Sequence, residues 1–433
     1  MHELRRALSG VAVCAAAAAA IVVTPIDPRV HAAAPACDPD NGGIKLPQGF
    51  CAMVAATDLG PARHLTVAPN GDVYVAIQQN RSDTAGIVAL RDTEGDGKFD
   101  QKELITAAGG GTGVAIRNDY LYLATPTSVV RWKMTKGQLK PTGEMETIVT
   151  GFTPQFQHED KGIAFDAKGG LYVNVGAPSN ACQQPDRRAK IPGQDPCPLL
   201  EHYGGVWKFD ENKLNQKQAD GTRYATGLRQ MPAIAWHGGN LYIVMNNRDS
   251  IDQLWPDTFK AEDNQTRPAE PMYRVDAAGD NFGWPYCFFD YTQNRLLLNP
   301  EYGGDGKEVG RCTQFKNPIA AFPAHWAPVA VTFYTGSQFP KKYEGGAFIA
   351  FHGSWNRSPA PQDGYNVTFQ PFSGSRPSGP FEVFADGFAG TTPLMQPGRA
   401  AARADGVAQA PDGSLYIAES QKGKVWRVFY RSR

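Results

Sequence analysis

The feature that most constrains the fold of this sequence is a hairpin pattern that recurs six times along the chain. Each copy consists of a short apolar strand, a turn containing Gly, Asn or Asp, and a second strand in which Leu-Tyr or Val-Tyr is typical. Alternating apolar and polar residues across such a turn indicate a β-hairpin. Five clear copies and one degenerate copy cover residues 64–76, 113–124, 162–176, 233–247, 406–420 and, for the degenerate copy, 329–353.

A third strand follows each hairpin. These six segments are residues 86–92, 128–134, 204–210, 271–276, 365–372 and 423–430. Six units of three clear strands and a weaker fourth predict an all-β fold, a six-bladed β-propeller. An ordinary sandwich, the alternative, needs no sixfold recurrence. We therefore predict a single propeller domain over residues 37–433, with loops on one face where the later hairpins are spaced by more than one blade.

Residues 1–36 are predicted to be a signal peptide with its cleavage region. Arg5 and Arg6 precede the apolar run GVAVCAAAAAAIVV, and small residues follow around RVHAAAPA. Lipid attachment at Cys14 is an alternative, although Val13 stands where such sites usually need a small residue. No later run of about 20 apolar residues occurs, so we expect a periplasmic or secreted protein with no integral membrane segment.

Charge and motif content argue against several classes of protein. The 43 basic and 43 acidic side chains balance, and no basic stripe indicates a nucleic-acid partner. The sequence contains no GxSxG, no HExxH and no phosphate-binding glycine loop. The sequence therefore does not indicate a serine hydrolase, a zinc protease or a nucleotide-binding protein with these motifs.

Six cysteines remain after the signal peptide is removed. An even number in an exported chain implies disulfides. Pairing of sequence neighbours gives 37–51, 182–197 and 287–312, although six cysteines allow fifteen connectivities. A metal site is the alternative, but there is no CxxC and no tight Cys/His cluster. The residues are Cys37, Cys51, Cys182, Cys197, Cys287 and Cys312.

An acidic loop begins at the end of the third strand of the first repeat, residues 86–92. Its carboxylates occupy positions 1, 3, 5, 9 and 12 of an EF-hand-like spacing, with Gly97 at position 6. No flanking helix pair is expected, so the loop cannot act as a sensor. We predict a structural Ca²⁺, with a solvated acidic turn as the alternative. The candidate ligands are Asp92, Glu94, Asp96, Asp100 and Glu103.

Seven further motifs occur in a fixed order between about residues 45 and 430. Together they resemble the soluble quinoprotein glucose/sorbosone dehydrogenase family. The resemblance implies a six-bladed propeller that holds pyrroloquinoline quinone (PQQ) and Ca²⁺ at the centre of one face. The motifs lie at 158–176, 226–236, 246–256, 279–287, 325–334, 348–358 and 403–420.

The resemblance implies that His158 is the catalytic base. It stands just before the first strand of the third blade, and a strand that begins near the axis would place the imidazole over the central cavity. A neutral imidazole can accept the proton that a sugar hydroxyl loses when hydride leaves. The alternative is a histidine that caps a strand end by bonding to the backbone.

Cofactor contacts are implied at several positions. PQQ carries three carboxylates, which planar guanidinium groups bind well. Arg229 and Arg403 match family arginines, and Arg357 is a looser third candidate; each has an ordinary surface arginine as its alternative. Asn246 begins the segment NNRD, which lies where consecutive backbone carbonyls hold the PQQ-bound Ca²⁺ in the family.

Within NNRD, Asn247 and Arg248 are predicted to donate main-chain oxygens to Ca²⁺, a hard cation that polarises the quinone as a Lewis acid. Asp249 either adds an oxygen or makes an Asx turn. Two positions depart from the glucose enzymes. Ala177 stands where an aspartate supports the catalytic histidine, and Asp405 stands where a second arginine falls. Both departures are more similar to the sorbosone-type branch.

Other loop residues offer a sugar platform at the same mouth. Trp326 or Trp355 could stack on a pyranose or on the quinone, near His325 and His352. The alternative is that the tryptophans wedge between blades.

Three functional hypotheses follow. The first is an exported PQQ- and Ca²⁺-dependent dehydrogenase that oxidises an aldose or related sugar and passes electrons to an unknown acceptor. The second is a Ca²⁺-dependent lactonase, for which only Asn246, Asn247 and Asp249 offer ligands. The third is a cofactor-free propeller that binds carbohydrate or protein, because fold does not fix function.

Overall fold

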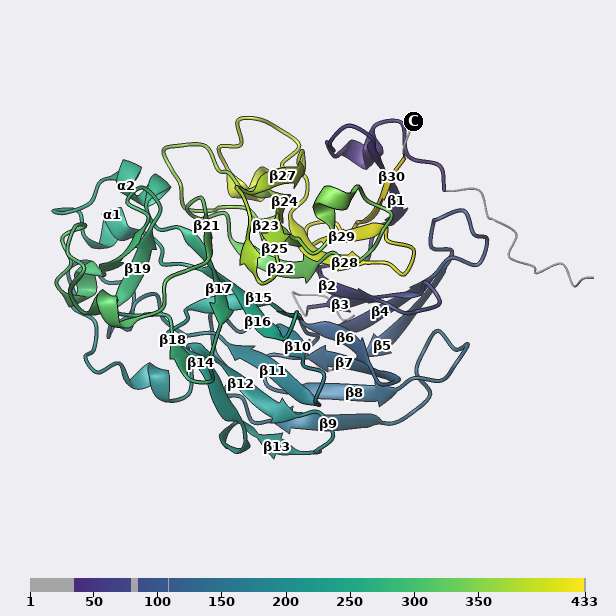
Figure 1. Cartoon of the computed structure of the whole chain (residues 1–433), viewed down its shortest axis with the longest axis horizontal. Helices are drawn as coiled ribbons and strands as arrows, with labels where there is room; N and C mark the ends of the chain where they lie inside the picture. The colour runs from purple at the N-terminus through teal and green to yellow at the C-terminus, as the bar shows by residue number, and fades with distance from the viewer. Residues whose placement is uncertain (1–34, 79–84, 108, 432–433) are drawn as a thin grey trace, which may run out of the picture. The chain divides into compact units, whose positions relative to one another are not determined.

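All six predicted hairpins are present, and each forms the first two strands of a small antiparallel sheet (Figure 1). The structure is a computed structural model that describes residues 35–78, 85–107 and 109–431. The predicted signal peptide therefore lies almost wholly outside the described residues. Six sheets arranged as blades confirm the predicted propeller. Among the described residues, no helix has the length and apolar character needed to cross a membrane.

Each blade has four main strands that run in order from the centre outward. In five blades the strands follow one another along the chain. These blades are β2–β5 (Ala62–Val67, Val73–Ile77, Gly86–Arg91, Gln101–Thr106), β6–β9 (Val114–Arg117, Tyr120–Ala124, Val129–Lys133, Met145–Thr150), β10–β11–β12–β14 (Ile163–Phe165, Gly170–Val175, Gly205–Asp210, Thr222–Thr226), β15–β16–β17–β21 (Gln230–His237, Asn240–Asn246, Glu270–Val275, Ala320–Phe322) and β22–β23–β24–β27 (Pro328–Phe333, Ala347–His352, Tyr365–Gln370, Glu382–Ala385).

The sixth blade joins the two ends of the propeller. Its inner strands β28 (Ala404–Gln409), β29 (Leu415–Glu419) and β30 (Val425–Tyr430) come from the end of the chain. Its outer strand β1 (Phe50–Ala56) comes from the beginning and pairs antiparallel with β30. The hairpin pattern predicted the three inner strands but did not identify this partner.

The first strands of the six blades contact one another in a closed ring around the axis. Two glycines show how close the contacts are. A Cβ on Gly162 would lie 2.0 Å from the carbonyl oxygen of Pro232, and one on Gly406 would lie 2.4 Å from that of Arg63. The glycine that begins several of the sequence hairpins is therefore required by the neighbouring blade.

The recurring tyrosine of the second strand packs between blades. Tyr172, for example, lies in one core cluster with Leu241 and Ile243 of the following blade. Burying an aromatic side chain contributes about 1.5–3 kcal/mol, so the repeated residue stabilises each blade interface. The five tyrosines are at most 2% exposed: Tyr74, Tyr122, Tyr172, Tyr242 and Tyr416.

Insertions between strands carry the remaining elements. The segment before β17 contains α1 (Ile251–Leu254) and α2 (Ala261–Thr266), and the segment before β21 contains the hairpin β19–β20 (Cys287–Asp290, Arg295–Leu298). Short strands β13 (Gln216–Lys217) and β18 (Asp280–Asn281) extend two blades, and β25–β26 (Phe372–Ser373, Arg376–Pro377) form a small hairpin. Seven 3₁₀ turns occur in the described residues: Asn41–Gly43, Pro198–Glu201, Gln218–Asp220, Pro300–Tyr302, Gly310–Gln314, Lys341–Tyr343 and Pro397–Arg399.

All three predicted disulfides are confirmed. Cys37 pairs with Cys51, Cys182 with Cys197 and Cys287 with Cys312. The first fastens the N-terminal segment to β1. The other two lie in insertions of the later blades, where the chain departs furthest from the simple repeat.

Candidate functional site

A cavity of about 240 Å³ lies where the inner strands and the insertions meet. Four predicted site residues line it: His158, Arg229, Asn246 and Asn247. The structure therefore brings together residues that are up to 89 positions apart in the sequence, 158 to 247. His325, His352 and Trp355, which the sequence offered as a sugar platform, line the same cavity.

Four of the six inner strands have a β-bulge or register shift close to their first residue, at this cavity. The irregularities fall between Ala62 and Leu65 in β2, and between equivalent positions in β15, β22 and β28. A bulge redirects side chains that a regular strand would place elsewhere. Arg63, Pro232 and Val329 lie within these segments and line the cavity.

His158 has a backbone φ of 60°, and Gln155 holds this turn by donating to the carbonyls of His158 (2.7 Å) and Gly176 (3.1 Å). The Nδ1 atom of His158 lies 2.5 Å from the carbonyl oxygen of Ala177. Because a carbonyl only accepts, Nδ1 must carry the proton, which leaves Nε2 with its lone pair. Burial, together with the positive charge of Arg229, lowers the pKa of His158 to about 3.

The orienting aspartate that the sequence lacks is thus replaced by a main-chain carbonyl. Ala177 accepts the Nδ1 proton as a carboxylate would, and so fixes the same tautomer. It brings no negative charge, however, so it does less to stabilise an imidazolium. The alternative predicted for His158 was a strand-end histidine bonded to the backbone. It accounts for the contact of Nδ1 but assigns no role to Nε2.

Arg229 is 2% exposed and is held from three directions. Its guanidinium donates to the carbonyl of Asn247 (2.8 Å), to Oδ1 of Asn180 (3.0 Å) and to Asp249 (2.5 Å). Its Nε atom is buried and has no hydrogen-bond partner among the described residues. An orphaned donor beside a cavity is a position at which a ligand acceptor would be favoured.

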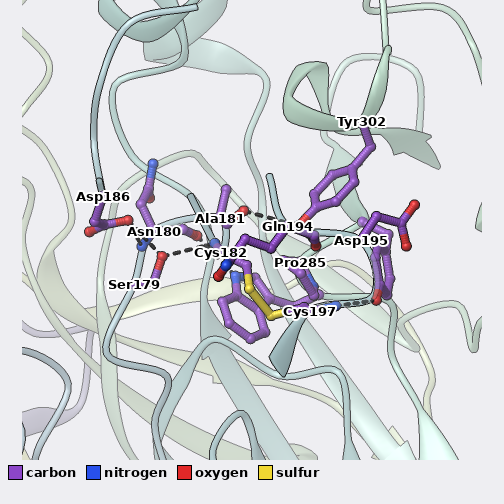
Figure 2. The surroundings of a disulfide bond; sticks show 12 residues. Ser179, Asn180, Ala181, Cys182, Asp186, Gln194, Asp195, Cys197, Pro285 and Tyr302 are labelled. Carbon is purple, nitrogen blue, oxygen red and sulfur yellow. Dashed lines mark hydrogen bonds between the residues drawn. A yellow bond between two sulfur atoms is a disulfide. The ribbon is translucent and has the colours of Figure 1, made fainter. Parts of the chain in front are cut away.

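Asn180 connects Arg229 to the loop that follows Ala177. Its Oδ1 accepts from Arg229 and from the backbone N–H of Asp249, while its carbonyl accepts from the Trp284 indole. Figure 2 shows Asn180 beside the Cys182–Cys197 disulfide. The disulfide therefore braces the loop that positions the Arg229 guanidinium.

Asp249 is an ion-pair centre and makes no Asx-turn bond in the described structure. Its carboxylate accepts from Arg229, from Arg187 (2.9 Å) and from the amide of Asn356 (3.0 Å). These guanidinium groups hold the pKa of Asp249 well below its usual range. The turn containing Asn247 is fixed on the cavity by this carboxylate.

Glu270 adds to the cavity a carboxyl group that forms no ion pair with a cationic side chain of the described residues. It is 2% exposed and accepts backbone N–H groups from Asn247 (2.8 Å) and Ala327 (3.4 Å). Burial, reinforced by the nearby Asp249, raises the pKa of Glu270 to about 8. No sequence pattern indicated this residue, because it is an isolated glutamate at the start of β17.

Arg63 is another residue that the sequence analysis missed, as it missed Asp160, Gln230 and Asn356 of the cavity lining. Its guanidinium donates to Asp405 (2.8 Å) and to Asp160 (3.0 Å). Asp405, the position that lacks the family arginine, therefore pairs with an arginine supplied by the neighbouring inner strand. Since Arg63 lines the cavity, it supplies a positive charge near the position where the family arginine is missing.

Four predicted residues do not line the cavity. The side chain of Arg248 is fully buried and binds Asn299 and Glu301. Arg357 donates to the carbonyls of Gln265 and Ala324, and it does not line the cavity.

Arg403 and Trp326 also lie off the cavity lining. Arg403 donates to the carbonyls of Gly353 (3.4 Å) and Ser354 (3.2 Å), so it supports a lining residue from behind. Trp326 is 7% exposed and belongs to the core cluster with Phe351. For Trp326 the structure matches the interblade alternative.

The acidic loop is distant from this chemistry. Asp92 and Asp96 accept N–H groups of their own loop, and Asp100 accepts from Thr93. Glu103 lies in β5. Across residues 35–78, 85–107 and 109–431, no three His, Cys, Asp or Glu side chains are grouped to hold a metal ion. The calcium loop, with all five of its candidate ligands including Glu94, stays a prediction.

The buried titratable groups of the cavity predict a stability maximum near pH 6.5. Burial lowers the pKa of His158 to about 3, that of His325 to about 4 and that of His352 well below 6.5, so the unfolded chain binds all three protons first as pH falls below 6.5. Glu270, with its raised pKa, acts in the opposite sense between pH 4.5 and about 8. Each group changes the free energy of unfolding by about 1.4 kcal/mol per pH unit.

Three imidazoles outweigh one carboxyl, so the free energy of unfolding falls by at least about 1.4 kcal/mol per unit from pH 6.5 to 4.5. From pH 6.5 to 8, Glu270 alone lowers it by about 1.4 kcal/mol per unit. Denaturant unfolding of protein free of cofactor, at five pH values, measures both limbs. The Glu270→Gln variant should lose the alkaline limb and show a steeper acid limb, because Glu270 no longer opposes the histidines. A curve that is flat between pH 4.5 and 8 would contradict the assignment.

Comparison with known proteins adds to this geometry. A family model described as TrAA12-like matches residues 44–431. Among curated proteins, a pyrroloquinoline quinone-dependent pyranose dehydrogenase of Coprinopsis cinerea is 25% identical over 251 residues, which cover 52% of this chain and 31% of the relative. This chain spans 61% or less of the length of the curated relatives it matches.

Two solved structures share the fold. The holo form of the pyranose dehydrogenase PQQ domain from Coprinopsis cinerea has a TM-score of 0.70 at 17% identity, covering 89% of this chain and 97% of that one. The calcium structure of a Trichoderma reesei carbohydrate-active enzyme of family AA12 has a TM-score of 0.72 at 18% identity, covering 90% and 97%. At these identities the likeness supports the fold.

Proposed function

This chain belongs to the TrAA12-like family, and on that premise we propose that it is a sugar oxidoreductase that binds PQQ and Ca²⁺ in the central cavity. The single observation that carries the proposal is the meeting of a tautomer-fixed imidazole, buried guanidinium groups and main-chain oxygens in one cavity. The resemblance to quinoprotein dehydrogenases is confirmed at the level of the family, whereas the sorbosone-type branch stays a prediction.

The charges of the cavity fit a tricarboxylate that arrives with a divalent cation. Two guanidinium groups, Arg63 and Arg229, line it against three carboxyl groups, Asp160, Asp249 and Glu270. A tricarboxylate alone would add three negative charges to a lining with no positive surplus. Ca²⁺ cancels two of these charges, so we expect PQQ uptake to depend on Ca²⁺.

Orphaned polar atoms supply both kinds of contact. Nε of Arg63 and Nε of Arg229 are buried donors with no partner in the part of the chain that the structure describes, and they are suited to carboxylates. Oε1 of Gln230 and Oδ1 of Asn356 are buried acceptors that likewise lack a partner among those residues. These oxygens and the main-chain carbonyl of Asn247 are the hard ligands that Ca²⁺ prefers. Asn246, whose amide donates to the carbonyl of Pro328 (2.7 Å), holds the turn at its start.

When bound, PQQ supplies the electron-accepting carbonyl that receives the hydride of the sugar, with Ca²⁺ as Lewis acid. The chain supplies the base. Nε2 of His158 takes the proton of the hydroxyl on the carbon that loses hydride, while Ala177 holds the ring in the required tautomer. Arg229 keeps the imidazole neutral before the reaction, because its positive charge opposes protonation.

The three disulfides support an oxidising compartment, and so the proposal includes export. The electrons must then pass to an acceptor outside the cytoplasm, whose identity the proposal leaves open. A lactonase is disfavoured, because its candidate ligands are engaged elsewhere: the amides of Asn246 and Asn247 donate to main-chain carbonyls, and Asp249 pairs with Arg229. A cofactor-free binding module remains the second candidate and is an outcome of the following experiment.

The proposal is tested by titrating purified protein with PQQ, with and without Ca²⁺. We expect stoichiometric uptake only with Ca²⁺, and quinone absorbance that bleaches when an aldose is added. Arg229→Ala should weaken uptake at least tenfold, whereas Arg311→Ala, which removes an exposed arginine, should leave it unchanged. Sugar binding without any PQQ uptake would replace the oxidoreductase by the binding module.

A further inference from the structure

The turn that carries His158 has a conformation that residues other than glycine rarely adopt. His158 has a backbone φ of 60°, in the left-handed region, where a Cβ crowds the main chain. Such a residue persists only where its surroundings hold it, and residues of this kind gather at functional sites. The contacts that hold this turn therefore bear on what His158 does.

Four consecutive main-chain carbonyls of the turn, at positions 157–160, accept hydrogen bonds from side chains. Nε2 of Gln155 lies 2.8 Å from the oxygen of residue 157 and 2.7 Å from that of residue 158. Nζ of Lys161 donates to the carbonyl of residue 159 (3.1 Å), and Nδ2 of Asn174 donates to that of residue 160 (3.0 Å). The turn is thus held by donors of three side chains.

Strand β11 and the residues after it lie against the same turn. Asn174 belongs to β11, is fully buried, and accepts the N–H of Gly162 at Oδ1. A Cβ on Gly176 would lie 2.5 Å from the carbonyl oxygen of His158 and 2.9 Å from its Cβ, so only glycine fits there. Ala177, the next residue, supplies the carbonyl that binds Nδ1. One short stretch of chain therefore locates both the turn and the imidazole.

Lys161 is the residue of this set that costs the fold most. It is 1% exposed, and its amine makes a single hydrogen bond among the described residues, to the carbonyl of residue 159. The amine also lies 5.3 Å from the centre of the Phe152 ring. Burial lowers the pKa of Lys161 to about 8 despite the nearby carboxylates of Asp160 and Glu159, so the fold disfavours this charge. The turn that Lys161 holds, and not stability, explains why the cation is buried there.

We propose that Lys161, Gln155 and Asn174 are positioning residues for the base, acting through the carbonyls of the His158 turn. If the turn relaxes, the imidazole leaves the carbonyl of Ala177, and Nε2 is displaced from the hydroxyl whose proton it must take. A misplacement of about 1 Å can cost about 10²-fold in rate, even when every reacting group is still present. This inference rests on the proposed function, in which His158 is the base.

Lys161→Met tests the proposal, because methionine has a similar length and the substitution removes the charge and the donor. With an aldose and protein loaded with PQQ and Ca²⁺, we expect kcat to fall at least about tenfold, while KM and PQQ uptake change less than about twofold. The midpoint of denaturant unfolding should stay equal or rise, because the buried charge is gone.

Two further variants sharpen the test. Gln155→Met removes the donors to residues 157 and 158 without changing a charge, and it should lower kcat in the same way. Lys168→Met, which removes an exposed lysine of the turn between β10 and β11, is the matched control and should behave as wild type does.

The ring of His158 supplies a readout that needs no cofactor. In cofactor-free protein whose histidine ring nitrogens carry an NMR label, the His158→Ala variant identifies the resonances of His158. We expect one fixed tautomer, with the proton on Nδ1, in wild type and in Lys168→Met. Lys161→Met and Gln155→Met should lose that single tautomer.

The positioning role would be overturned by an unchanged kcat or an unchanged tautomer in both variants. It would also be overturned by a lower unfolding midpoint in Lys161→Met with the tautomer intact, or by loss of PQQ uptake in that variant. The two proposals fail separately. If wild type takes up no PQQ but both variants lose the fixed tautomer, the positioning role stands and the oxidoreductase falls.

Discussion

Replacing His158 by alanine is expected to lower kcat for an aldose by about 10²–10⁴-fold while PQQ and Ca²⁺ are still taken up. His158 is the one cavity histidine whose Nδ1 is bound by a carbonyl oxygen, at 2.5 Å, and whose other nitrogen has no hydrogen-bond partner among the described residues. The positive charge of Arg229 acts on this ring. Without it, the hydroxyl proton has no acceptor at the reacting carbon, although the sugar and cofactor contacts remain.

The pH profile gives a second measurement for His158. Because burial and Arg229 lower its pKa to about 3, the base stays unprotonated across the neutral range, and kcat/KM should show no acid limb near pH 6.5. His202→Ala, which removes a histidine that is mostly exposed, is the control and should retain full activity. Activity in His158→Ala within threefold of wild type would assign the base elsewhere.

Local patterns predicted most of the propeller, because a hairpin needs only neighbours in sequence. Alternation around a turn gave all six inner strand pairs, and the recurring Tyr and Gly mark contacts with the next blade. The pairing of β1 with β30 joins Phe50 to Tyr430, residues 380 positions apart, and nothing local in either strand indicates the other. Closure of a ring is a global property.

The same distinction between local and global features applies to the site residues. His158, Arg229 and Asn247 lie in motifs that carry the resemblance, and the structure places all three on one cavity. Arg63 was not predicted, because in the sequence it is an ordinary polar residue of a strand. The register shift in β2 is what directs it toward the cavity. The main-chain carbonyl of Ala177, which binds His158, was not predicted for another reason. Every residue has such a carbonyl, so the side chain at position 177 does not indicate its role.

Arg357 shows the limit of assigning a role from residue type. Its position in a motif near the cavity suggested that the guanidinium binds a cofactor carboxylate. In the structure the guanidinium instead donates to main-chain carbonyls. Cofactor arginine and structural arginine have the same sequence signature, since both need five donors in a plane. Only the positions of the acceptors distinguish them.

Replacing Arg248 by methionine is expected to lower the free energy of unfolding by about 3–5 kcal/mol. Arg248 and Glu301 have side chains that are 1% and 0% exposed, and the guanidinium also donates to Asn299 (3.0 Å). Removal of the cation leaves a carboxylate buried without a partner, which costs far more than the pair contributes. The double variant Arg248→Met with Glu301→Leu should recover at least half of the loss.

Denaturant unfolding at pH 7 measures these changes, and the exposed pair of Arg311 and Asp195 provides the matched control. Its side chains are 37% and 44% exposed, so Arg311→Met should cost at most about 1 kcal/mol. The double variant also examines the proposed metal turn. If Arg248 serves Ca²⁺ through its main-chain oxygen alone, the refolded double variant takes up PQQ and Ca²⁺ as wild type does, because the substitution changes the side chain and keeps the carbonyl. Lost uptake in a double variant of wild-type stability would instead give the guanidinium itself a part in holding the site.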